Sequence, residues 1–215
     1  RLRPDGEKGA IAVSITRFAE YYIKDAWTWE KLALVKARII TDPAQAQAVV
    51  KALTEAINGI TQDPINMPII SKAVLDMRRR LRDAYGSASA LQLRKLPGGM
   101  AELDLLVQGL RLVHADLFQG TGQNQIEIIS KLARHERISQ IDAANLESAS
   151  QLFSNVYSSL RLCVGAVRQN ADEFNAAVVG FIVQNNDATD EPHLVAMLNT
   201  NRRKVEAVFE VVFPA

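Results

Sequence analysis

The stretch LESASQLFSNVYSSLRLCVGAV, from Leu146 to Val167, decides the fold class. Its apolar residues recur at alternating spacings of three and four, which places them on one face of an α-helix. These residues are Leu146, Ala149, Phe153, Val156, Leu160, Cys163 and Val167. A long apolar face of this kind is typical of helical bundles. We therefore predict one long helix here, buried along this face.

Helical patterns continue on both sides of this stretch. We expect a short helix that Ser14 can cap. We expect further helices over 26–40, 42–58, 74–85, 101–118 and 126–134, from Asp172, and over 192–213. FQGTGQNQ, over 118–125, is predicted to be a loop. The strand signal is weak and limited to AIAV, over 10–13. The sequence thus predicts an all-α bundle over 42–215, preceded by a short piece of another domain over 1–41, with the boundary near Thr41.

Composition excludes several classes of protein. The 215 residues carry a net charge of +1, which gives no electrostatic reason to expect nucleic acid or an anionic membrane as a partner. Apolar runs fall short of the roughly 20 residues that a membrane-spanning helix needs. The single cysteine and the three widely spaced histidines match no disulfide or metal pattern. We expect a cytoplasmic protein and assign no metal ligand.

Arginines mark two places in the sequence. Arg1 and Arg3 would share one face of an extended segment and could bind a polyphosphate, although spacing alone favours a pair of surface arginines. The run Arg78, Arg79, Arg80 and Arg82 is expected to be a solvated helix face, with contact to an acidic partner or phosphate as the minority alternative. Trp27 and Trp29 are expected to be packing anchors.

LRKLPGGMAELD, over 93–104, is the other unusual stretch. Gly98 and Gly99 precede a helix whose first turn contains Glu102 and Asp104. Glycines allow close approach of a ligand to a helix N-terminus, but the two acids are equally explained by the helix dipole. From these patterns alone we assign no catalytic residue.

Taken together, these stretches resemble the bacterial glutamine-synthetase adenylyltransferase family, in its C-terminal, adenylylating half. R-L-R-P-x-G-x-x-G matches Arg1 to Gly9, S-x-x-x-F-x-x-Y matches Ser14 to Tyr21, and A-W-T-W-E matches Ala26 to Glu30. Further on, RKLPGGMAELD resembles the family's K-x-x-x-G-G-[IL]-x-D-[IL]-E-F, with Glu102 in place of Asp and Asp104 in place of Glu.

The resemblance implies a nucleotidyltransferase that moves AMP from ATP, with Mg²⁺, to a tyrosine of glutamine synthetase and so regulates nitrogen assimilation. It implies that residues 1–41 end the nucleotidyltransferase domain and that Arg1 and Arg3 contact nucleotide phosphates. The family's metal-binding aspartates would precede Arg1. The segment alone is therefore expected to contain no catalytic residue, to be inactive and to bind neither ATP nor Mg²⁺ tightly. A cleft loop is implied at Arg94, Lys95, Gly98, Gly99, Glu102 and Asp104.

A second interpretation stays open. The helices could form a non-catalytic module that binds glutamine synthetase or a PII-type signal protein. The resemblance does not choose between the two for this segment.

Overall fold

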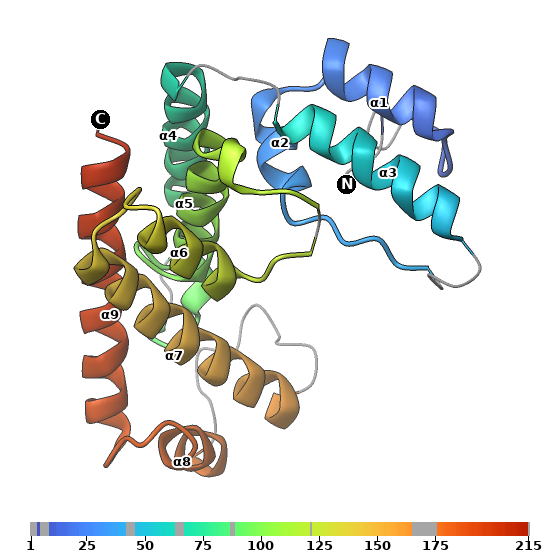
Figure 1. The fold of residues 1–215 in the computed structure, drawn as a ribbon. Helices are drawn as coiled ribbons and strands as arrows, with labels where there is room; N and C mark the ends of the chain where they lie inside the picture. The colour runs from blue at the N-terminus through green and yellow to red at the C-terminus, as the bar shows by residue number, and fades with distance from the viewer. Residues whose placement is uncertain are drawn as a thin grey trace. The chain divides into compact units, whose positions relative to one another are not determined.

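The protein is described by a computed structural model that covers residues 4, 9–41, 46–62, 67–86, 89–120, 122–164 and 176–214. The predicted all-α class is confirmed: over these ranges the regular elements are all helical (Figure 1). The strand predicted over 10–13 is wrong. A four-residue extended segment needs a neighbouring strand to bond its backbone, and the described residues include none.

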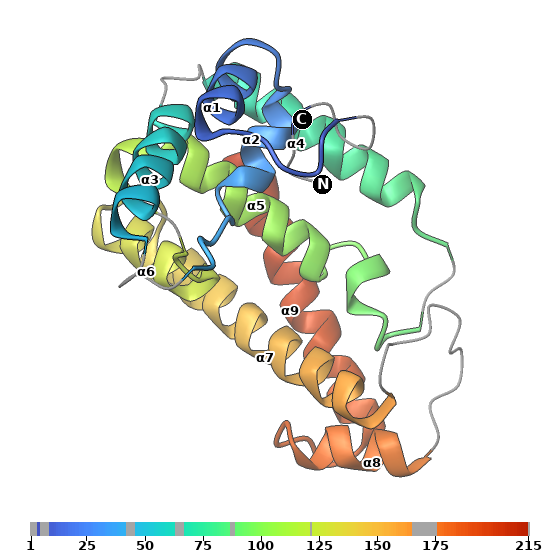
Figure 2. The same cartoon turned by 90° about the vertical axis from the view of Figure 1, so that its right-hand side faces the viewer.

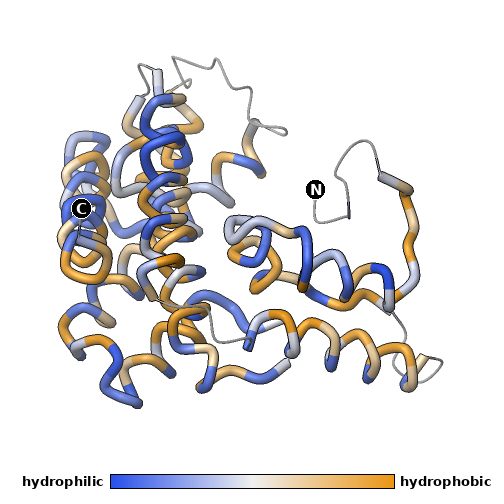
Figure 3. The backbone as a smooth tube through the Cα atoms, turned by 90° about the horizontal axis from the view of Figure 1, so that it is seen from above, coloured by the Kyte–Doolittle hydropathy of each residue, from blue (hydrophilic) through white to orange (hydrophobic). Residues whose placement is uncertain are grey.

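The helices run in the following order along the chain. The α-helices are α1 Ile15–Lys24, α2 Thr28–Leu34, α3 Gln47–Thr61, α4 Met67–Asp83, α5 Met100–Val113, α6 Gln125–Arg134, α7 Gln140–Val164, α8 Ala176–Gln184 and α9 Glu191–Val212, and the 3₁₀ helices are η2 Leu93–Lys95 and η3 Ala115–Leu117. Hydrophilic and hydrophobic stretches alternate along the helices, as expected for amphipathic elements (Figure 3). No helix in the described ranges has the length and apolarity required to span a bilayer.

The chain forms two compact units, and both contain more than one segment of the sequence. The first unit comprises the described residues of Arg1–Met77 and Leu105–Leu132, and the second those of Arg78–Asp104 and Ala133–Ala215. Helices α4 and α5 each contribute residues to both units. The domain boundary near Thr41 stays a prediction.

In the first unit, α3 packs against α1 and α2 around a core of Tyr21, Tyr22, Leu34, Ile57 and Ile60. The predicted cap is confirmed, because the Ser14 side chain accepts a hydrogen bond from the Arg17 amide at 3.2 Å. The helix predicted over 26–40 is shorter and ends at Leu34. Past Leu34 the backbone makes bonds three residues apart, such as Ala37 N–H to Leu34 C=O, which tighten the last turn and end the helix.

Helix α3 differs from its prediction at its C-terminal end. It continues past Gly59 to Thr61, because tertiary packing of Ile57 and Ile60 outweighs the low helix propensity of glycine. The predicted start at Asp42 and Pro43 lies outside the described residues.

In the second unit, α7 and α9 lie side by side, and α8 packs against both (Figures 1 and 2). The predicted long helix is confirmed, and it begins earlier, at Gln140. Its residues Leu146, Ala149, Phe153, Val156 and Leu160 are all buried. Cys163 is exposed, which corrects its predicted place on the buried face, because it lies in the last turn of α7. Val167 and Asp172 lie outside the described residues.

The buried face of α7 yields a direct test. We expect Phe153→Ala to lower the free energy of unfolding by about 3–5 kcal/mol, because it removes a fully buried ring and leaves a cavity. Leu162→Ala is the control on the same helix, since Leu162 is 81% exposed, and it should change stability by less than about 0.5 kcal/mol. Urea unfolding followed by circular dichroism measures both. Similar losses for the two variants would contradict the predicted face.

Candidate functional site

The structure describes six of the eight predicted site residues. Arg1 and Arg3 lie outside the described residues. The other six lie in the second unit, along η2, the turn that follows it and the start of α5: Arg94, Lys95, Gly98, Gly99, Glu102 and Asp104.

Glu102 is completely buried and is held by two arginines. Its Oε2 accepts from Arg78 Nε at 2.9 Å and its Oε1 accepts from Arg82 Nε at 2.8 Å, with a further bond from Arg82 Nη2 to Oε2 at 3.0 Å. Burial alone would raise the pKa of Glu102, but the hydrogen bonds from Arg82 and Arg78 outweigh it and lower this pKa. Glu102 is therefore a carboxylate with fixed partners inside the fold.

Helix α9 completes the ion-pair cluster. Arg82 Nη2 donates to Glu206 Oε1 at 2.7 Å, and the Arg78 guanidinium lies 4.0 Å from the centre of the Phe209 ring. Nearby, the Arg202 Nε–H donates to the Pro97 carbonyl at 2.8 Å. These contacts join the end of α4, the start of α5 and the middle of α9 through charged groups.

Within the described ranges, two buried polar atoms of this cluster have no hydrogen-bond partner. They are Arg78 Nη2 and the Tyr85 hydroxyl. Burial, together with the Glu102 charge, raises the pKa of Tyr85 to about 12, so this phenol is neutral at pH 7 and is no general base. The cluster is suited to holding helices together rather than to proton transfer.

The glycine pair is required by packing. Gly98 has φ +67°, and a Cβ on it would overlap the Arg202 carbonyl oxygen and lie 2.8 Å from Glu206 Cγ. A Cβ on Gly99 would overlap the Leu93 carbonyl oxygen. Both glycines are buried. Their close approach is therefore to the protein's own backbone, which gives Gly98 and Gly99 a structural role.

The remaining predicted residues are more accessible. Arg94 is exposed, while Lys95 and Asp104 are half-buried. The Arg94 guanidinium lies 6.0 Å from the Tyr157 ring centre, and that of Arg161 lies 5.9 Å from the same ring. The role of this stretch as a cleft loop stays a prediction.

The sequence analysis missed several members of the cluster. Arg78 is buried, which corrects the prediction that the whole arginine run is a solvated face, whereas Arg79 and Arg80 are exposed as expected. Arg78 and Arg82 are four residues apart and share one helix face, so their spacing carried a signal. Glu206 and Arg202, on the distant α9, carried none.

The AWTWE stretch lies in the first unit. Glu30 is buried, and its carboxylate accepts from the Tyr21 hydroxyl at 2.9 Å and from the Trp27 amide at 2.8 Å. Trp27 is 71% exposed and Trp29 is 41% exposed, so the prediction that they are packing anchors is wrong. Here the acid holds the turn and the tryptophans point outward.

A magnesium site finds no support among the described residues. They contain no group of three or more His, Cys, Asp or Glu side chains arranged to hold a metal ion. They therefore do not fit a Mg²⁺·ATP centre, and we assign them no step of its chemistry.

Comparison with known proteins identifies relatives over the whole chain. Residues 1–53 match the family model for glutamate-ammonia ligase adenylyltransferase. The chain is 32% identical over 213 residues to the bifunctional glutamine synthetase adenylyltransferase/adenylyl-removing enzyme of Rhodopseudomonas palustris strain TIE-1, covering 97% of this chain and 21% of the relative. The enzyme of the same name from Xanthobacter autotrophicus is 30% identical over 98% of this chain and 21% of its own length. The chain thus spans about a fifth of these relatives.

The Glu102 ion pairs predict a pH-dependent stability. We expect Glu102→Gln to lower the free energy of unfolding by about 3–5 kcal/mol at pH 7, because it leaves Arg78 buried without a counter-charge. Since the pKa of Glu102 is lowered from its ordinary 4.5, the stabilisation is complete above pH 4.5 and is lost as the pH falls through the folded-state value. Urea unfolding of the unchanged protein and of Glu102→Gln would be measured from pH 7 to pH 3. The difference between their free energies of unfolding should become smaller below pH 4.5.

Glu206→Gln serves as the control for this prediction. Glu206 is partly exposed and Arg82 keeps its bonds to Glu102, so the loss should stay below about 1 kcal/mol. A Glu102→Gln effect that is equally small, or that does not change with pH, would contradict the assigned role of the cluster.

The turn before α5 generates a separate prediction. We expect Gly98→Ala to destabilise the protein by at least about 2 kcal/mol, because a side chain at φ +67° meets the α9 backbone. Gly180→Ala, in α8, is the control: nothing lies within 4 Å of its added Cβ, and the change should stabilise the helix by up to about 1 kcal/mol. Thermal unfolding measures the stability of both variants. A Gly98→Ala variant as stable as the unchanged protein would refute the packing explanation.

Proposed function

We propose that this chain acts as part of a nucleotidyltransferase. The reason is that the chain belongs to the glutamate-ammonia ligase adenylyltransferase family over the segment that it shares with the relatives described above. The reaction would move AMP from ATP to a tyrosine hydroxyl of glutamine synthetase and so regulate nitrogen assimilation in the bacterial cytoplasm. The observation that carries the proposal is the match of residues 1–53 to the family model, which includes both the RLRP and the AWTWE stretches.

Arg1 and Arg3 are the residues that we assign to the nucleotide. Nucleotidyl transfer depends mainly on positioning and on neutralising phosphate charge, and a guanidinium can do both. We assign the carboxylates that hold Mg²⁺ to residues outside these 215, so the segment alone should be inactive. The ion-pair cluster around Glu102 would support the helices and make no contact with substrate.

A second candidate function is a docking module without chemistry of its own. The observation in its favour is a pair of exposed apolar side chains in the first unit: Ile23 is 64% exposed and Trp27 is 71% exposed. Exposed tryptophans are enriched in protein interfaces and often dominate their binding energy. The partner would be glutamine synthetase, with a PII-type signal protein as the other candidate.

A chimaera tests both candidates. This chain would replace the matching segment of the Rhodopseudomonas palustris relative, and transfer of label from α-labelled ATP to glutamine synthetase would be measured with Mg²⁺. We expect the chimaera to transfer label and the chain alone to transfer none. Changing Arg1 and Arg3 to Ala in the chimaera should lower the rate of transfer at least about tenfold, because each lost phosphate contact weakens charge neutralisation.

Circular dichroism and direct binding to glutamine synthetase accompany each assay. A folded chimaera that binds glutamine synthetase without labelling it would reject the catalytic proposal and leave the docking module. In that case Trp27→Ala should weaken binding, with Leu162→Ala as the exposed apolar control. Absence of both label and binding would reject both candidates.

A further inference from the structure

Arg111 is a buried cation without an acidic partner. It lies in the first unit, in the part of α5 that follows Leu105, and is 2% exposed. It forms no ion pair within the part of the chain that the structure describes, and burial lowers its pKa. A buried charge without a counter-charge is costly and calls for a specific explanation.

The protein satisfies this guanidinium only in part. Arg111 Nη2 donates to the Gly120 carbonyl at 3.1 Å and to Gln123 Oε1 at 3.1 Å, and the guanidinium carbon lies 5.4 Å from the centre of the Phe118 ring. Arg111 Nε is buried and has no hydrogen-bond acceptor among the residues that the structure describes. The contacts of Arg111 are all to neutral groups, so none supplies a counter-charge.

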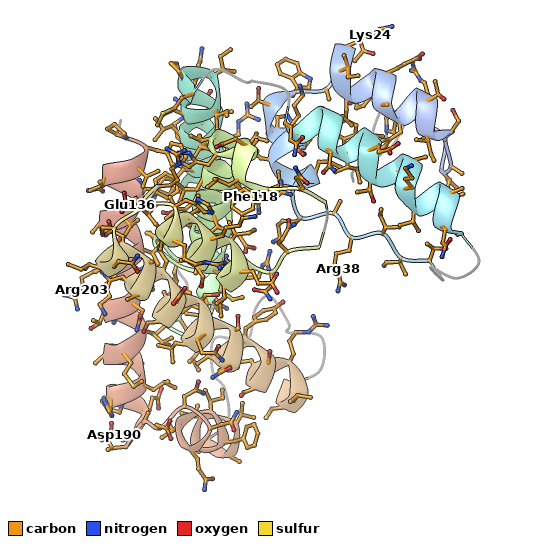
Figure 4. All side chains as sticks on the ribbon, viewed as in Figure 1. Lys24, Arg38, Phe118, Glu136, Asp190 and Arg203 are labelled. Carbon is orange, nitrogen blue, oxygen red and sulfur yellow. The ribbon has the colours of Figure 1, made fainter. Side chains whose placement is uncertain are left out.

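A second cation lies against the same ring. The ammonium of Lys131, on α6, is 5.3 Å from the centre of the Phe118 ring. Phe118 is labelled in Figure 4. It too has no ion pair within the described ranges. Two positive charges beside one ring raise the local positive potential, which favours binding of an anion there.

The loop beside Arg111 is held in place from α3. The Gly120 amide donates to Asn58 Oδ1 at 2.8 Å, and Gln62 Nε2 donates to the Phe118 carbonyl at 2.7 Å. Gly120 and Gly122 have φ of +77° and +87°, a backbone conformation that favours glycine. A Cβ built on Gly120 would meet no described atom within 4 Å, whereas one built on Gly122 would lie 3.8 Å from Arg38 Cγ. Phe118 and Gly120 are therefore held in place before any ligand arrives, which lowers the entropic cost of binding there.

We propose that Arg111 and Lys131, together with Gly120, Gly122 and Gln123, form a binding site for a phosphate group. A phosphate carries close to two negative charges near pH 7 and so matches the two cations, whereas a single carboxylate would leave one of them uncompensated. The site is separate from the Glu102 cluster, and it does not depend on the proposed adenylyltransferase function.

Thermal unfolding of this 215-residue chain tests the site. The melting temperature would be measured with sodium phosphate and with sodium chloride at equal ionic strength. We expect phosphate, at about tenfold above its Kd, to raise Tm by roughly 3–6 °C more than chloride does. The proposal would be overturned if Tm were the same in the two salts and if adenosine 5′-monophosphate also left Tm unchanged. Arg111 would then be a residue that only holds the loop.

Variants locate the bound phosphate. Arg111→Gln can still donate to neighbouring acceptors but lacks the charge, and Lys131→Gln changes a half-buried side chain that the fold can spare. Each should weaken phosphate binding at least about tenfold, as one lost charge-assisted contact does. Arg80→Gln, an exposed change of equal charge, is the control and should leave binding unchanged.

Lys131→Gln keeps the test decisive if Arg111→Gln fails to fold. A phosphate effect that survives Lys131→Gln unchanged would overturn the assigned site. Adenosine 5′-monophosphate and adenosine distinguish the source of the phosphate. Stabilisation by the monophosphate but not by inorganic phosphate or adenosine would assign the site to a nucleotide phosphate, and equal stabilisation by both phosphates would assign it to the phosphate group alone.

Discussion

The buried charge of Glu102 is the constraint on which the second unit depends. A carboxylate without access to water is tolerated only when fixed donors surround it, and here Arg78 and Arg82 supply three hydrogen bonds. Arg82 extends the network to Glu206, and Arg78 lies over Phe209, so α9 is held by the same charges. The end of α4, the start of α5 and the middle of α9 are therefore coupled, and a change at one of these groups should affect the stability of all three.

The same constraint explains the turn that leads into α5. For Glu102 to reach the arginines, the chain must approach α9 closely enough that Gly98 meets the Arg202 backbone, and no other residue type leaves this space. The Arg202 bond to the Pro97 carbonyl holds the turn from the other side. The space beside Gly98 and Gly99 is thus filled by the protein's own backbone.

Two buried charges of the first unit have neutral hydrogen-bond partners instead of ion pairs within the ranges that the structure describes. Glu30 is compensated by neutral donors, the Tyr21 hydroxyl and the Trp27 amide, and this arrangement leaves Trp27 in solvent. Among the described residues, Arg111 is buried with neutral acceptors alone, and its Nε has no acceptor. A charge-neutral cluster such as that of Glu102 is complete within the fold, whereas an uncompensated cation such as Arg111 favours an external anion.

The sequence by itself determined the helical class, the long apolar face of α7, the Ser14 cap and the family, because helical periodicity, caps and ordered motifs are local patterns. The end of α2, the extension of α3 and the exposure of Cys163 and Trp27 were missed, because packing decided them. Only the tertiary structure paired Glu102 with Arg78, Arg82 and, through them, Glu206. Residues 20 to 124 positions apart meet there, and no local pattern carries the energy of a buried ion pair between them.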